Sequence, residues 1–90
     1  MNTSTPNRPR AHDVRFDGGL MHVELEDGRV LTTSYDRFPK LVHAKPVQRN
    51  RWEIIGHGVG IHWPDLDEDL STDGLLRDAI RVRNVRRRAG

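Results

Sequence analysis

Between residues 14 and 35, apolar and polar side chains alternate, and each alternating run ends at a turn sequence. In the run 21–25, Met, Val and Leu occupy every second position, which is the period of a strand that buries one face. The turn sequences are Asp-Gly-Gly at 17–19 and Asp-Gly at 27–28, where the positive φ of a tight turn costs little. This pattern predicts three antiparallel strands joined as a meander.

Shorter patterns continue after the meander. Asp36 is the expected N-cap of a helix over residues 37–44, and residues 47–50 predict one further helical turn. Residues 52–55 return to a strand-like composition. The middle of the chain therefore adds short helices and one more strand to the meander.

The last elements are a strand at residues 61–63 and a helix. Pro64 should end this strand, because proline lacks the amide hydrogen that a strand ladder needs. Ser71 is the expected N-cap of the helix, which should present Leu75 and Leu76 to the core. The predicted fold is α+β: one small domain with an antiparallel sheet of about four to five strands and two or three short helices.

Charge divides the chain into three parts. The net charge is only +2, but residues 77–90 contain six arginines and one aspartate, while residues 11–76 carry a charge of −5. Residues 1–11 contain two prolines and little apolar surface, so we expect a flexible arm there. The α+β domain is expected over residues 12–76, followed by a basic tail over residues 77–90 whose first residues are a candidate for helix.

Composition excludes several classes of function. The chain has 90 residues and no cysteine, which excludes disulfides, thiolate catalysis, iron–sulfur clusters and cysteine-bound zinc. No apolar run approaches the roughly 20 residues of a membrane-spanning helix, and the N-terminus does not resemble a signal peptide. We therefore expect a protein of the cytoplasm that binds no cofactor.

Four carboxylates lie within five residues immediately after an aromatic corner. Carboxylates this close repel one another unless they meet cations, backbone amides or a partner. The residues of this acidic corner are candidates for binding a partner: His62, Trp63, Asp65, Asp67, Glu68 and Asp69. The competing interpretation is a solvated or helix-capping cluster, since the expected helix begins directly afterwards.

For the other candidate sites, a structural role explains the residues better than a chemical one. The corner and His57 contain possible metal ligands, but their spacing matches no known site, and Leu70 stands where a calcium loop needs glycine. The glycines of residues 56–60 favour a tight turn over a phosphate loop, because no Gly-Lys-Ser or Gly-Lys-Thr follows. No nucleophile is placed beside His62. Trp52 and Trp63 are more typical of core residues than of base-stacking platforms. We therefore assign no catalytic and no metal-binding residues.

Several short segments of residues 12–76 together carry a resemblance to a known family: His43-Ala44, Gln48-Arg49-Asn50, Trp52, Gly60-Ile61-His62-Trp63-Pro64 and Leu66-Asp67-Glu68-Asp69-Leu70-Ser71. The resemblance is to a bacterial family, the domain of unknown function 2442. It implies a small α+β domain and brings no catalytic residues with it. Relatives are often encoded beside another small protein, in an arrangement similar to a toxin–antitoxin pair.

The resemblance and the charge pattern lead to one hypothesis. The protein would be a non-enzymatic, antitoxin-like interaction module that masks a small basic partner, encoded nearby, with its acidic corner. Complementary charge would speed encounter, and Trp63 would supply the desolvated anchor that slows dissociation.

Two other classes of function remain open. A nucleic-acid-binding accessory protein would contact phosphates through the arginines of the tail, Arg81, Arg83, Arg86, Arg87 and Arg88. A metal-dependent enzyme using His62 and the acidic residues is the least favoured class. A three-stranded meander also leaves a free edge through which a homodimer could form.

Overall fold

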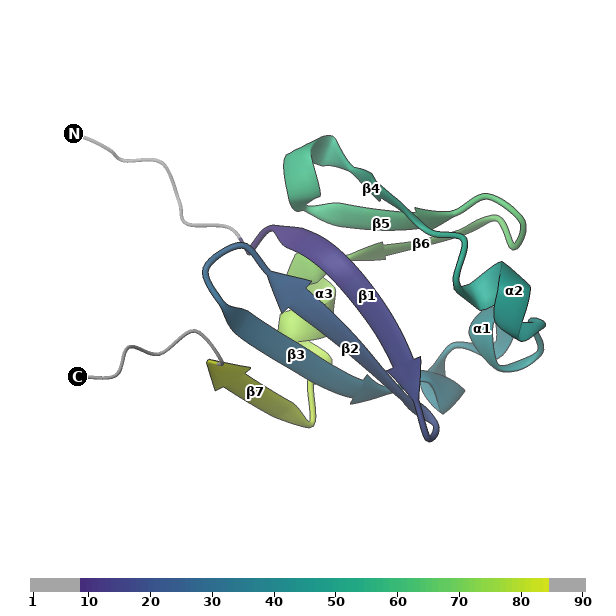
Figure 1. Ribbon diagram of the computed structural model, residues 1–90, viewed down its shortest axis with the longest axis horizontal. Helices are drawn as coiled ribbons and strands as arrows, with labels where there is room; N and C mark the ends of the chain where they lie inside the picture. The colour runs from purple at the N-terminus through teal and green to yellow at the C-terminus, as the bar shows by residue number, and fades with distance from the viewer. Residues whose placement is uncertain (1–8, 85–90) are drawn as a thin grey trace.

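The computed structural model describes residues 9–84, which form two antiparallel sheets and three short helices (Figure 1). The first sheet has the strand order β1-β2-β3-β7 and the second the order β4-β5-β6. The strands are β1 (Ala11–Asp17), β2 (Leu20–Leu25), β3 (Arg29–Ser34), β4 (Glu53–Ile55), β5 (Gly60–Trp63), β6 (Glu68–Ser71) and β7 (Arg81–Asn84). The helices are α1 (Pro39–Val42), α2 (Pro46–Arg49) and α3 (Thr72–Asp78), with 3₁₀ turns η1 (Tyr35–Arg37) and η2 (Gly56–Gly58). The predicted α+β class is confirmed.

The meander of β1, β2 and β3 forms as its alternation predicts. Val23 pairs with Val14 on one side and with Leu31 on the other, and directly paired residues share a face of the sheet. These three side chains are buried. The inner face of the first sheet is therefore one wall of the core.

The other walls of the core come from the second sheet, α1 and α3. Figure 1 shows α3 behind the first sheet, with the second sheet above it and α1 and α2 at one end. Ile61 and Trp63 of β5, Leu41 of α1 and Leu75 of α3 complete the apolar cluster. Within residues 9–84, no helix is long and apolar enough to cross a membrane.

Ser71 caps α3 as predicted, and the next residue ties three segments together. The Ser71 hydroxyl accepts a hydrogen bond from the amide of Gly74 at 3.0 Å. The buried hydroxyl of Thr72 donates to the carbonyl of Pro9 at 2.7 Å, and its amide donates to the carbonyl of Val59 at 2.9 Å. The start of α3 is thereby joined to the chain before β1 and to the chain before β5.

The predicted boundary between arm and domain lies too far along the chain. Strand β1 begins at Ala11, which is 1% exposed and belongs to the core, and Pro9 is also buried. The carbonyl of Arg10 accepts a hydrogen bond from the amide of Glu26. Backbone pairing with β2 orders these residues although their own sequence shows no strand pattern. The rest of the predicted arm, residues 1–8, lies outside the described residues.

Asp36 does not cap a helix. It lies within η1 and accepts a hydrogen bond from the Ser34 hydroxyl at 2.6 Å. Helix α1 begins only at Pro39, with Phe38 as its N-cap. Proline at the first helical position fits its fixed φ and missing amide hydrogen, so Pro39 sets the start of the helix.

Two strands have no counterpart in the sequence prediction. Strand β6 contains acidic residues that were expected to precede a helix directly, and β7 lies in the segment that was expected to be a basic tail. Helix α3 does extend into that tail, as far as Asp78, before β7 returns to pair with β3. In place of the predicted single sheet of four to five strands, the described residues form two sheets with seven strands in total.

Candidate functional site

The residues of the acidic corner lie at the end of β5, in the turn between β5 and β6, and at the start of β6. Asp67 adopts a positive φ of 51° in this turn, a left-handed conformation that Asp tolerates better than most residues. The Lys40 ammonium group of α1 donates to the backbone carbonyl of Asp67 at 2.8 Å. Arg51 reaches the carboxylate of Asp65 at 2.9 Å. Two cations on neighbouring elements thus hold the turn in place.

On the second sheet, one histidine lies between two carboxylates. His62 is paired with Glu53 of β4 and with Asp69 of β6, and residues paired across antiparallel strands share a face. The Nδ1 atom of His62 lies 2.5 Å from Oδ1 of Asp69. The row Glu53–His62–Asp69 therefore faces away from the core with its charges adjacent.

This row changes the acidity of the histidine. The hydrogen bond with Asp69 raises the pKa of His62 above its ordinary value of 6.5. Partial burial opposes this shift, while the negative charges of Asp69, Glu53 and Asp67 add to it. The raised pKa means that His62 keeps its proton to a higher pH than an isolated histidine would.

The structure brings only some of the predicted partner-binding residues to the surface. Asp65, Asp67 and Asp69 are exposed, and His62 is partly exposed. Glu68 pairs with Trp63, so it stands on the opposite face of the sheet from the Glu53–His62–Asp69 row. The predicted cluster is thus split between two faces.

The proposed anchor role of Trp63 is wrong. Its side chain is fully buried in the core, and its indole Nε1 donates to the backbone carbonyl of Arg49 at 2.9 Å. A strand with period two places Trp63 on the same side as Ile61, facing inward. Trp63 therefore packs in the core beneath the surface of the corner and cannot contact a partner directly.

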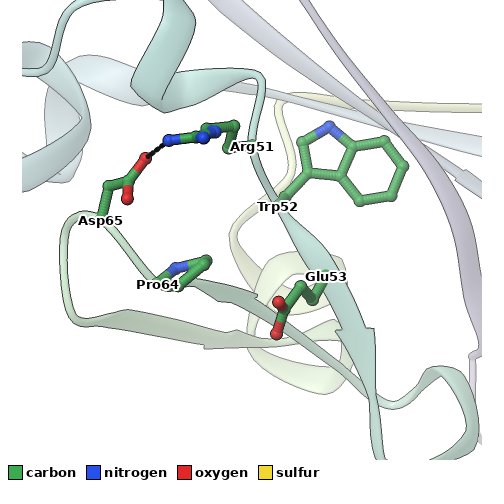
Figure 2. Close-up of a pocket in the computed structure, with 5 residues that line it drawn as sticks. All are labelled: Arg51, Trp52, Glu53, Pro64 and Asp65. Atoms are coloured by element: carbon green, nitrogen blue, oxygen red, sulfur yellow. Dashed lines mark hydrogen bonds and ion pairs between the residues drawn. The ribbon is translucent and has the colours of Figure 1, made fainter.

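Two residues at the corner were not among the predicted ones. Arg51 and Glu53 line a shallow, open hollow of about 400 Å³ together with Trp52, Pro64 and Asp65. Figure 2 shows Arg51 joined to Asp65 across this hollow, with Glu53 projecting from β4. The register between β4 and β5, which places Glu53 beside His62, follows from the turn at η2 and is not visible in residue types alone.

Several residues of the family-like segments have structural roles. Arg49 donates from Nη1 to the carbonyls of Leu41 and Ala44, at 3.0 and 2.8 Å, and its guanidinium lies 5.0 Å from the centre of the Tyr35 ring. The Gln48 side chain accepts from the amide of Lys45 at 2.9 Å. These contacts hold α1 and α2 against the core, and so position Lys40 beneath the corner.

The remaining candidates lie elsewhere. His57 occupies η2 with a φ of 58°, at the opposite end of β5 from the corner. Within residues 9–84, no three or more His, Asp or Glu side chains converge as metal ligands would. Arg81 and Arg83 are exposed on β7, whereas Arg86, Arg87 and Arg88 lie outside the described residues.

Comparison with known proteins identifies a family but not an activity. The chain is similar to a protein of unknown function from Rhodospirillum rubrum: the crystal structure superposes with a TM-score of 0.70 at 35% sequence identity, covering 83% of this chain and 93% of that one. No curated protein matches the chain. The family model "Protein of unknown function (DUF2442)" matches residues 11–81. The chain therefore belongs to the DUF2442 family, as its sequence segments indicated.

Proposed function

We propose that this protein is a non-enzymatic interaction module of the cytoplasm that binds a small basic protein through its acidic corner, in the manner of an antitoxin. The observation that supports this proposal most directly is how few bonding partners the carboxylates of this surface have. Within residues 9–84, the side chains of Glu53 and Asp67 have no hydrogen bond or ion pair, and Asp69 has only His62. These acids face solvent on a framework held by Lys40 and Arg51.

A preformed acidic surface suits a basic partner for two physical reasons. Unpaired carboxylates on one face create a potential that speeds encounter with a cationic surface. Because the corner is already held by neighbouring elements, little ordering is required on binding. Complementary charge would thus govern the association rate and exclude acidic proteins.

An apolar contact is also needed for a long-lived complex. Since Trp63 is in the core, we assign this role to Ile55, which is 41% exposed. Ile55 lies on β4 two residues after Glu53, on the same face. It would replace the tryptophan as the aliphatic part of the interface, beside the carboxylates.

The test uses a double variant that removes two negative charges from the corner, Asp67→Asn with Asp69→Asn, and a matched control, Asp17→Asn with Asp36→Asn. Both pairs are exposed and remove the same charge. The tagged proteins are used to capture partners from the lysate of the native host after nuclease treatment, and the affinity of the captured protein is then measured at two salt concentrations.

We expect a basic protein that the wild type and the control retain, and that the corner variant binds at least about tenfold more weakly. Most of this change should lie in the association rate, with a smaller dependence on salt. Equal affinity of all three proteins, each shown to be folded, would contradict the proposal.

Nucleic-acid binding is the second candidate. It is favoured by Arg81 and Arg83, which are exposed on one face of β7 and have no ion pair within the described part of the chain. If these residues contact phosphates, affinity should fall steeply with salt, and substituting both arginines should reduce the slope.

A further inference from the structure

Strand β7 forms one edge of the first sheet and is exposed at every position. Among the described residues, 9–84, it pairs with β3 alone, and all four of its residues are exposed. An edge strand presents backbone N–H and C=O groups that can pair with another chain. The surface at β7 lies on a different sheet from the acidic corner and has the opposite charge.

The hydrogen-bonding pattern shows which backbone groups face outward. The carbonyl of Thr32 accepts from the amide of Ile80 at 2.8 Å, so the backbone of Thr32 faces β7. Thr32 is in register with Arg81, and hydrogen-bonded pairs alternate along an antiparallel ladder. Arg81 and Arg83 therefore turn their backbone groups towards β3, whereas Val82 turns its N–H and C=O towards the open edge.

The side chains at this edge are of two kinds. Arg81 and Arg83 project to the outer face and have no ion pair or hydrogen bond through their side chains within residues 9–84. Ile80 and Val82 are 61% and 45% exposed. Basic residues are common on edges because they discourage pairing, but that explanation does not account for the two exposed aliphatic side chains.

The same features argue against two other occupants. In a symmetric pairing with a second copy centred on Val82, each Arg81 would lie opposite an Arg83 of the other copy, and like charges directly opposite are destabilising. Proteins that bind single-stranded nucleic acid combine cations with aromatic stacking platforms, and the exposed neighbours here are aliphatic. An extended chain with acidic and apolar residues in alternation fits the cations, the aliphatic side chains and the open backbone together.

We propose that β7 is a docking edge for an extended, acidic segment of a partner protein, which adds as a further strand to the first sheet. Acidic side chains of that segment would lie opposite Arg81 and Arg83, and an apolar one opposite Val82. Main-chain hydrogen bonds would give affinity and the alternating side chains would give specificity.

The test titrates the isotope-labelled full chain with a short synthetic peptide of alternating glutamate and valine, followed by NMR. A twin peptide, N-methylated at the central valine, has the same charge but lacks the backbone donor that would meet Val82. We expect shifts centred on β7 and β3, at least about tenfold slower amide exchange at Val82, and at least about tenfold weaker binding of the twin.

Two protein variants complete the test. Val82→Pro should fold, because its amide takes no part in the ladder with β3, and should lose the peptide. Arg81→Glu with Arg83→Glu should lose it as well and gain binding to a lysine–valine peptide. Three results would overturn the proposal: equal binding of the twin peptide, binding of a single-stranded oligonucleotide at β7 without binding of the peptide, or self-association of the free protein through β7.

Discussion

Arg49 is only partly exposed, and removing its guanidinium group should lower the stability of the fold markedly. We consider Arg49→Met, with Arg51→Met as its control two residues away. Methionine keeps an unbranched apolar stem in both cases and removes only the cationic head. The two arginines differ in what this head contacts. Arg49 bonds the carbonyls of Leu41 and Ala44 and lies over Tyr35, whereas Arg51 pairs with an exposed carboxylate.

The expected magnitudes follow from these contacts. A charged hydrogen bond to a partly buried carbonyl contributes about 1.5–3 kcal/mol, and a partly exposed cation–π contact adds about 0.5–1 kcal/mol. Because one nitrogen serves both carbonyls, we count one such bond and expect Arg49→Met to lower the free energy of unfolding by about 2–4 kcal/mol. An exposed ion pair is worth about 0–1 kcal/mol, so Arg51→Met should change stability by no more than that amount.

Urea denaturation followed by tryptophan fluorescence measures both values, since Trp63 passes from the core to water on unfolding. In thermal melts, Arg49→Met should lower Tm by about 8–32 °C for a domain of this size. The dependence of the free energy on urea should stay the same if the unfolded state is unaffected. Equal destabilisation by the two substitutions would refute the assignment of Arg49 as the residue that fixes α1 and α2.

Two further predictions concern His62 and one glycine. The pKa of His62 is raised in the folded state, so its stabilising contribution is complete below about pH 6.5 and is lost as pH rises through the folded pKa. In the variant Asp69→Asn, an NMR titration should show a lower pKa for His62. An unchanged pKa would show that Asp69 is not the cause of the shift. Gly58 has a φ of 99°, and an added Cβ would lie 2.8 Å from Cβ of Arg10, whereas Gly19 has a φ of 85° and open space around it. Thermal melts should therefore show a larger loss of stability for Gly58→Ala than for Gly19→Ala. The Gly19 variant bears only the backbone strain of about 1 kcal/mol or more. Equal losses would mean that the chain at β1 relieves the clash with the new Cβ without losing stability.

The sequence was sufficient for the elements in which local pattern and tertiary environment agree. The alternation of Met21, Val23 and Leu25 and the Asp-Gly turn at Gly28 define the meander because burial and turn geometry favour the same arrangement. Ser71 is recognisable as a cap because the capping bond is local. For these elements, no information from distant parts of the chain was required.

The missing elements depend on pairing with distant residues. The composition of β7, Arg-Val-Arg-Asn, is not strand-like by propensity, and its partner β3 lies about fifty positions earlier in the chain. In the candidate site, the proximity of Glu53 to His62 depends on the register across η2. The inward orientation of Trp63 follows the period of β5, but the sequence alone does not say which face of that strand is covered.

The pairing of β7 with β3 also has a consequence for synthesis of the protein. The strands β1, β2 and β3 are complete by residue 34, yet the first sheet lacks its fourth strand until residues 81–84 have left the ribosome. During translation, the outer edge of β3 is exposed while β4, β5, β6 and α3 are still being made. A chain stalled before residue 81 would display this edge to other nascent chains, so residues 81–84 determine when the edge of β3 is covered.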